Sequence, residues 1–247
     1  MLTRYTLRLR PDTPFHPDLS WSYRLYAAML EQAPAIFGER SHRDGTTPVS
    51  QFLTVGEEGL IWRVTLLGEE SRQALDPVLG ACAQLQLKRD HVTLHVAERQ
   101  REQIPDVDTL FALCAGGSGR HRLQFCTPAA FKSRGAYRIL PTTRLLLHSL
   151  FQQWNGCFPD CPIEDEDGQG LETMADGLLC SRFALHDQSY CLKGKRIPGF
   201  VGSMTLENKL AGFHRELADA LLVFAGYAGA GIKTALGMGG VIHRMLP

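Results

Sequence analysis

The stretch VSQFLTVGEEGLIWRVTLL (residues 49–67) holds two apolar runs separated by GEEG, a pattern typical of two β-strands joined by a tight turn. Before it, residues 21–34 carry apolar side chains at spacings of three and four, which predicts a helix, and residues 2–10 alternate like a half-buried strand. After it, residues 70–85 predict a second helix and residues 91–96 a fourth strand. This order, strand, helix, strand, strand, helix, strand, is that of the ferredoxin-like split unit.

The second half of the chain repeats this order. Strands are expected at residues 120–126, 178–185, 199–206 and 238–243, and helices at residues 142–154 and 209–224. We therefore predict an α+β protein made of two tandem ferredoxin-like domains (RRM-like, βαββαβ), with residues 1–104 and 105–247 as the two domains.

The composition is that of an ordinary globular protein, since 44% of the 247 residues are apolar and 21% are charged. The longest apolar stretch, residues 218–231, is shorter than the roughly 20 residues that a membrane-spanning helix needs. Arg4, Arg8 and Arg10 interrupt the N-terminus where a signal peptide needs an unbroken apolar run. Seven scattered cysteines suit a reducing compartment better than a disulfide framework. The sequence therefore predicts a cytoplasmic protein.

The formal net charge is zero, but the charges are unevenly distributed. Residues 116–155 hold six Lys or Arg and no acid, whereas residues 160–176 hold seven acids and no Lys or Arg. Because the acids are concentrated there, the rest of the chain is net basic and can bind phosphates. Within the basic stretch, Phe125, Phe131 and Tyr137 are candidates to stack on bases, although strand aromatics more often belong to the core. The expected track for an RNA backbone consists of Arg120, Arg122, Lys132 and Arg134, with an ordinary solvated face as the alternative.

The segment GAGIKTALGMGG (residues 229–240) places pairs of glycines on either side of Lys233 and Thr234. Glycines let backbone amides approach a phosphate closely, and the lysine adds a positive charge. A P-loop is excluded because Ile232 separates glycine from lysine, and a dinucleotide-binding turn needs a third glycine where Thr234 stands. A tight helix-to-strand turn is the structural alternative. The candidate RNA-binding residues are Gly229, Gly231, Lys233, Thr234, Gly237 and Gly239.

This Gly-x-Gly, five residues, Gly-x-Gly arrangement near the C-terminus resembles the glycine-rich loop of the repeat-associated RAMP proteins and, more narrowly, of the Cas "six" family of CRISPR repeat-processing endoribonucleases. Further segments that resemble this family are residues 23–32 with Ser41, His42 and Pro48, then residues 127–155 and 197–207. The resemblance implies two ferredoxin-like domains and a catalytic histidine in the loop after the first helix, which here is His42. A lysine often found a few residues beyond that histidine is absent, and Arg40 or Arg43 could supply the positive charge.

The resemblance also implies a reaction in which a ribose 2′-OH of the RNA attacks the adjacent phosphate, leaving a 2′,3′-cyclic phosphate and a 5′-OH end. This step needs a base, an acid and cations near the phosphate. His42 titrates near neutrality and can serve in either proton role, and Tyr26 on the preceding helix is the candidate to orient the 2′-OH. We predict a metal-independent endoribonuclease that needs no cofactor and processes CRISPR repeat RNA (pre-crRNA) into guide RNA. Zinc is not expected, because the spacing of Cys157, Cys161, Cys180 and Cys191 is poor for a ligand set.

Two other functions fit parts of the sequence. A related RAMP protein that holds guide RNA in a CRISPR effector complex without cutting it would not need His42. A nucleotide-binding enzyme would instead use GAGIKT to bind ATP. The expected partners are CRISPR repeat RNA, subunits of a CRISPR effector complex, and a second copy of this chain in a homodimer.

Overall fold

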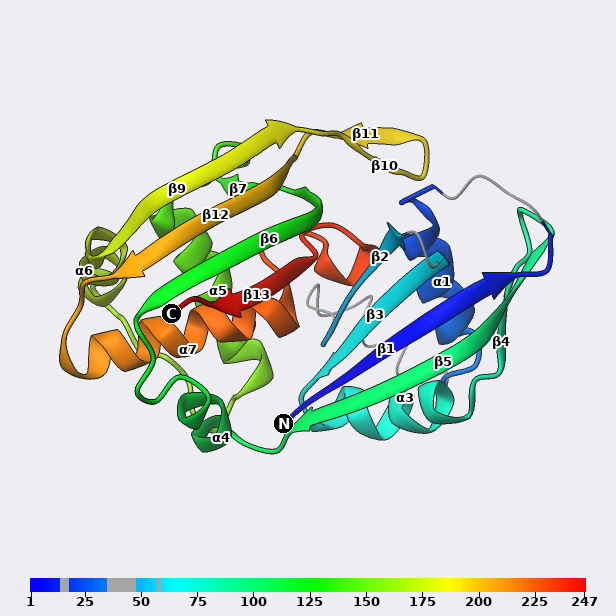
Figure 1. Ribbon diagram of the computed structural model, residues 1–247, viewed down its shortest axis with the longest axis horizontal. Helices are drawn as coiled ribbons and strands as arrows, with labels where there is room; N and C mark the ends of the chain where they lie inside the picture. The colour runs from blue at the N-terminus through cyan, green and yellow to red at the C-terminus, as the bar shows by residue number, and fades with distance from the viewer. Residues whose placement is uncertain (14–17, 35–47, 57–58) are drawn as a thin grey trace.

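The computed structural model describes residues 1–13, 18–34, 48–56 and 59–247, and these form two antiparallel sheets that lie side by side (Figure 1). The strands of the first sheet are β1 (Leu2–Pro11), β2 (Val49–Gly56), β3 (Gly59–Leu67), β4 (Gln84–Leu87) and β5 (Val92–Ile104). Their order across the sheet is β2-β3-β1-β5-β4. The first four strands in this order have the arrangement of a ferredoxin-like unit, and β4 is an additional strand at the edge.

Two helices cover one face of this sheet, α1 (Trp21–Leu30) and α3 (Glu69–Ala81). Helix α1 buries Trp21, Leu25 and Met29, whose spacing of four residues places them on one face of the helix. These side chains pack with Leu7 and Trp62 of the sheet in one hydrophobic cluster. The sheet and its helices therefore share a core of their own.

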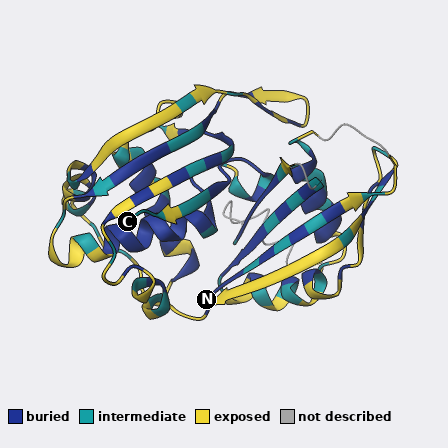
Figure 2. Cartoon of the chain, viewed as in Figure 1, coloured by how far each residue is buried: buried dark blue, intermediate teal, exposed yellow. Residues whose placement is uncertain are grey.

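The predicted helix at residues 70–85 is too long. Helix α3 ends at Ala81, and residues 84–87, with the sequence QLQL, form the edge strand β4, in which Leu85 and Leu87 are buried while the glutamines are exposed. This alternation is the period of a strand rather than of a helix. Strand β5 also continues eight residues past the predicted end at residue 96, because β1 pairs with it along its length although its side chains there are largely exposed (Figure 2).

The second sheet repeats the ferredoxin-like topology. It consists of β6 (Arg120–Ala129), β9 (Leu178–Asp187), β12 (Phe200–Asn208) and β13 (Val241–Met245), in the order β13-β6-β12-β9. All three pairings are antiparallel. The protein is therefore α+β with two tandem ferredoxin-like units, and the proposed domain boundary after residue 104 falls between β5 and α4 (Val107–Ala112).

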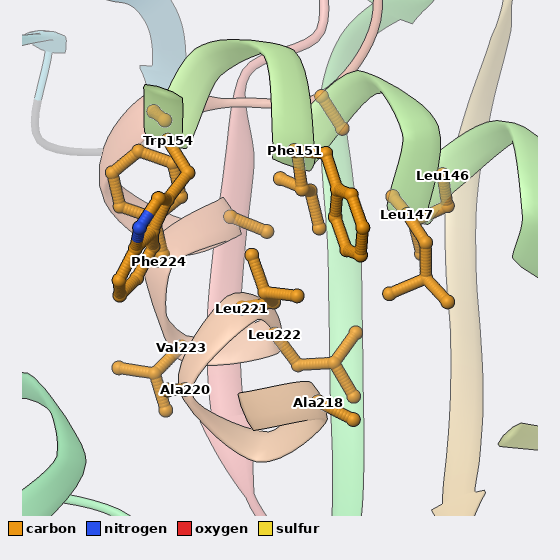
Figure 3. Packing of buried hydrophobic residues seen from close by; sticks show 14 of the residues in the cluster. Leu146, Leu147, Phe151, Trp154, Ala218, Ala220, Leu221, Leu222, Val223 and Phe224 are labelled. Carbon is orange, nitrogen blue, oxygen red and sulfur yellow. The ribbon is translucent and has the colours of Figure 1, made fainter. Parts of the chain in front are cut away.

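Helices α5 (Thr143–Cys157) and α7 (Gly212–Ala228) pack on one face of the second sheet (Figure 3). Helix α5 begins where the Thr142 side chain accepts a hydrogen bond from the Leu145 amide, at 3.1 Å. The ring of Trp154 meets that of Phe224 edge to face, with centroids 5.4 Å apart. Among the described residues, no helix lies on the opposite face of this sheet (Figure 1).

Shorter elements extend from the two ends of the second sheet. They are the hairpin β7 (Phe131–Ser133) and β8 (Ala136–Arg138), the hairpin β10 (Tyr190–Leu192) and β11 (Lys195–Ile197), and helix α6 (Gln169–Gly177). Asp165 from the acidic stretch accepts hydrogen bonds from the amides of Gly170 and Leu171, both at 2.9 Å, so this acid stabilises the start of α6. Along the described residues, no helix is long and apolar enough to cross a membrane.

The two units are joined by a partly buried cation as well as by apolar contacts. Arg4 of β1 donates a hydrogen bond to the carbonyl of Gly226 in α7, and its guanidinium lies 3.9 Å from the ring centroid of Tyr227. Glu102 pairs with Arg4 at 3.0 Å, which balances the charge. Because Arg4 bonds to the last turn of α7, the N-terminal sheet holds the helix that leads into the segment at residues 229–240.

A buried polar network ties α7 to β6 and β13. His121 lies 2.8 Å from Asp219 through Nε2 and 2.9 Å from His243 through Nδ1, and Asn208 donates to the same Asp219 oxygen at 2.6 Å. Burial, together with the neighbouring His121, lowers the pKa of His243 to about 4. The network therefore holds His243 neutral at physiological pH.

This network predicts a stability that falls with acidification. Between pH 6.5 and 4 the unfolded chain protonates His243 more fully than the folded chain does, so the free energy of unfolding should drop by about 2.5 kcal/mol over that range. Urea denaturation at pH 7.0, 5.5 and 4.5 measures this slope. The variant His243→Gln should flatten it, and an unchanged slope in that variant would show that another group titrates.

Candidate functional site

The segment at residues 229–240, here called the glycine-rich turn, connects the end of α7 to the start of β13. Gly229, Gly231, Gly237 and Gly239 all have positive φ, between +62° and +98°, which side chains with a Cβ rarely adopt. A short 3-10 helix, η1 (Thr234–Leu236), forms its middle. The spacing of the glycines in the sequence therefore reflects the backbone conformation that the turn requires.

The glycines also allow close packing. A Cβ on Gly231 would lie 2.2 Å from the carbonyl oxygen of Ala130, and one on Gly239 would lie 2.1 Å from that of Ala230. The first of these carbonyls also bonds to the turn, since the Ile232 amide donates to Ala130 at 2.9 Å. The glycines thus bring two stretches of backbone closer together than any other residue would permit.

The amides of the glycine-rich turn are mostly bonded inside the protein. Gly231 donates to Ser149 Oγ at 2.9 Å, Gly239 to the carbonyl of Pro128 at 2.9 Å, and Gly240 to Thr127 Oγ1 at 2.9 Å. The Gly229 and Gly237 amides donate to carbonyls nearby in the chain. These amides cannot cradle a polyphosphate, which removes the physical basis of the ATP-binding alternative. A phosphate can instead meet the tip, where Lys233 is exposed, and the RNA-binding role of the turn stays a prediction.

Both units hold the glycine-rich turn in place. Buried Gln51 of β2 donates from Nε2 to the carbonyls of Ala235 at 3.0 Å and Ser22 at 3.1 Å, and it accepts from Trp62 Nε1 at 2.8 Å. From the other side, the hydroxyl of Tyr190 in β10 donates to the carbonyl of Leu236 at 2.7 Å. Burial raises the pKa of Tyr190, which keeps this donor protonated. The turn is therefore a fixed part of the contact between the units.

The predicted catalytic residues are placed unequally. His42 lies outside the described residues, as do Arg40 and Arg43. The chain re-enters the described part at Pro48, and β2 then runs beside the glycine-rich turn through Gln51. Tyr26 lies on α1 with its side chain only 5% exposed, as a member of the N-terminal core. Its role in catalysis stays a prediction.

The basic residues expected to line one track lie near the two ends of one strand. Arg120 and Arg122 begin β6, whereas Lys132 and Arg134 lie in the β7–β8 hairpin beyond its other end, roughly 30 Å along the strand. The two pairs are therefore not neighbours in space, and a single track that joins them stays a prediction. Their contact with RNA stays a prediction at each end separately.

The three aromatic residues suggested to stack on bases differ in their exposure. Phe125 and Phe131 are 1% and 2% exposed and pack against Phe200, so the prediction that they stack on bases is wrong. Each belongs to the core on the helix-covered side of the sheet. Tyr137 of β8 is 45% exposed and remains able to stack.

Sequence reasoning missed a group of cations beside the glycine-rich turn. Lys193, Lys195 and Arg196 lie in the β10–β11 hairpin, whose apolar residues pack with Ala130 and Met238. Lys193 lies 5.1 Å from the ring centroid of Tyr23, at the start of α1. The run LKGKR at residues 192–196 is visible in the sequence, but only the fold places this hairpin against the glycine-rich turn.

No group of three or more His, Cys, Asp or Glu side chains within the described ranges could hold a metal ion. Cys157 is buried, which raises its pKa to about 12, whereas Cys161, Cys180 and Cys191 are exposed. The four cysteines considered for zinc are therefore in different environments and do not form a ligand set.

Two ferredoxin-like units hold a glycine-rich turn between them, just before the last strand, by hydrogen bonds from both sides. This is the arrangement expected of a RAMP-type protein. The family model for the CRISPR-associated endoribonuclease Cas6 matches residues 123–241. A CRISPR-associated endoribonuclease Cas6 of Mycobacterium tuberculosis is 30% identical over 250 residues, covering 97% of this chain and 77% of the relative. One from Streptococcus thermophilus is 26% identical over 228 residues, covering 92% of each.

Solved structures show the same fold. A Cas6 product complex has a TM-score of 0.78 at 22% identity, covering 98% of this chain and 99% of that one. Thermus thermophilus Cas6 has a TM-score of 0.74 at 21% identity, covering 99% and 98%. The chain belongs to the Cas6 family of CRISPR-associated endoribonucleases.

Proposed function

We propose that this chain cleaves CRISPR repeat RNA to guide RNA without a metal ion, using His42. The observation that carries the proposal is the glycine-rich turn, fixed by hydrogen bonds from both units, with β2 alongside and the cation-bearing β10–β11 hairpin packed against it. The segment that contains His42 rejoins the described chain at Pro48, one residue before β2. Related Cas6 proteins have been solved as a product complex, a substrate mimic complex and a histidine-to-alanine mutant, which supports the proposal.

Each group has a defined part in the proposed reaction. His42 transfers a proton, either from the attacking 2′-OH or to the leaving 5′-oxygen. Lys233 at the tip of the turn stabilises the negative charge that gathers on the phosphate, and Lys193 and Lys195 hold the neighbouring backbone. Tyr26 orients the 2′-OH. Because the nucleophile belongs to the RNA itself, no metal-bound water is needed.

Partners beyond the RNA are a further part of the proposal. CRISPR effector complex subunits would receive the guide RNA, and a homodimer would present two sites. A protein that holds RNA without cutting it remains the alternative, because one structural neighbour is described as a RAMP protein binding different RNA substrates. A cleavage assay distinguishes the two functions, because only the endoribonuclease cuts the RNA that it binds.

The reaction can be tested with a labelled repeat RNA in EDTA. We expect the wild-type protein to cut it at one position, leaving a cyclic phosphate that polynucleotide kinase can remove. A substrate with a single 2′-deoxy nucleotide at the mapped position should bind equally well and stay intact, because it lacks the nucleophile. Cleavage of the deoxy substrate, or a requirement for added Mg²⁺, would contradict the mechanism.

A further inference from the structure

Three arginines lie in one row across the open face of the second sheet. Arg244 of β13 pairs directly with Arg122 of β6, which pairs with Thr205 of β12, which pairs with Arg182 of β9. Directly paired residues in antiparallel strands project from the same face. That face is opposite to the one on which α5 and α7 pack, since buried Leu123 and Phe125 alternate with Arg122 along β6. The three arginines therefore share one face of the sheet, and each of them is exposed.

No carboxylate in the described part of the chain forms an ion pair with any of these three arginines. The nearby Arg120, on the same face, differs because Glu207 lies 3.8 Å from it. Arg122 donates only a long hydrogen bond to Ser203, at 3.3 Å. Like charges placed directly opposite each other weaken a sheet, so Arg122 and Arg244 reduce stability unless an anion lies between them.

A hollow lies where an anion would fit. It has a volume of about 180 Å³ and is lined by Arg122, Gln124, Ile242 and Arg244. Two of the lining residues are arginines and one is a glutamine, from neighbouring strands, and their side chains carry a donor set that suits phosphate oxygens. Ile242 and Arg244 lie two and four residues after Gly240, the last residue of the glycine-rich turn. At the rise of a β-strand, Arg244 is therefore roughly 13 Å along the chain from Gly240.

We propose that Arg122 and Arg244 bind a backbone phosphate of the substrate RNA on the open face of the second sheet, with Gln124 completing the site and Arg182 extending it. This inference rests on the proposed function, because it takes the RNA from there. The contact is independent of base sequence and fixes the path of the strand a few nucleotides away from the glycine-rich turn. The arginines face each other because the site is complete only when a phosphate lies between them.

The test uses the double variant Arg122→Gln with Arg244→Gln, which removes both charges and keeps side chains of similar length. The matched control is Arg72→Gln with Arg89→Gln, which removes two arginines from α3 and from the turn between β4 and β5. Affinity for repeat RNA is measured at several salt concentrations, with every protein also carrying His42→Ala so that the RNA stays intact. Thermal midpoints are measured without RNA.

We expect the double variant to bind RNA about 10- to 100-fold more weakly than the control. The slope of log affinity against log salt should become shallower by about 0.7 for one lost phosphate contact, or about 1.4 for two. The thermal midpoint should rise by about 1–3 °C, because the repulsion between the arginines is gone. A structural role would instead lower the midpoint.

The proposal is overturned if affinity and salt slope match the control, or if weaker binding comes with a lower midpoint. A higher wild-type midpoint in inorganic phosphate, with unchanged RNA affinity in the double variant, would assign the site to a free phosphate instead. If the protein with all its arginines neither binds nor cuts repeat RNA, the proposed function fails and this inference fails with it. If that protein binds and cuts repeat RNA but the double variant binds it as well as the control does, the proposed function stands and only this inference fails.

Discussion

Replacing His42 with alanine is expected to slow cleavage of repeat RNA by about 10²- to 10⁴-fold, the usual contribution of one proton-transferring group. Affinity for the RNA should stay within about twofold, because the glycine-rich turn and its cations supply the phosphate contacts. Single-turnover cleavage with protein in excess measures the chemical step, and fluorescence anisotropy with the 2′-deoxy substrate measures binding.

A matched control for this change is His95→Ala, which removes an exposed histidine from β5 on the first sheet. That variant should cut at the wild-type rate. If His42→Ala also cuts at the wild-type rate, another group transfers the proton and the assignment of His42 is wrong. If wild type binds the repeat tightly and never cuts it, the chain only holds RNA.

Replacing Gly231 with alanine is expected to lower the free energy of unfolding by about 2–4 kcal/mol. The backbone there has φ +91°, and the new Cβ would lie 2.2 Å from the carbonyl oxygen of Ala130. Relieving that clash must break the hydrogen bond from the Ile232 amide to Ala130. The glycine-rich turn would then separate from the start of β7, and RNA affinity should fall even at temperatures where the protein stays folded.

Gly135→Ala provides the control for backbone strain alone. Gly135 lies in the β7–β8 hairpin with φ +77°, but no atom lies within 4 Å of the place that a Cβ would occupy. We expect it to cost about 1 kcal/mol, with unchanged RNA affinity. Urea denaturation of both variants gives the comparison. Equal losses would mean that close packing at Gly231 contributes nothing to stability.

The order of the elements could be predicted because each depends on a local pattern. Alternation along residues 2–10 and the four-residue spacing of Trp21, Leu25 and Met29 appear in β1 and α1 as expected. The errors arose where a pattern was short or absent. QLQL at residues 84–87 is too short to separate from the preceding helix, and the last half of β5 is polar because only its hydrogen bonds to β1 make it a strand.

The candidate site was less predictable, because its parts come from distant segments. The glycines are visible in the sequence, but the expected reason for them, free amides facing a phosphate, differs from the observed one. Their amides donate to Ser149, Pro128 and Thr127, which the sequence gives no means of pairing with them. The basic residues of β6 and of the β7–β8 hairpin lie at opposite ends of a strand, which their closeness in sequence does not indicate, and their role as one RNA track stays a prediction.

The sequence by itself determined the two ferredoxin-like units, the family resemblance and the need for glycine at positive φ, because periodicity and backbone sterics act within a few residues. Only the tertiary structure decided which side chains meet. The row of Arg244, Arg122 and Arg182 exists through strand pairing, and the β10–β11 hairpin that carries Lys193 meets the glycine-rich turn through the hydrogen bond from Tyr190 to Leu236. Pairing register and hydrophobic packing join residues far apart in the chain, and no local pattern encodes which partners they select.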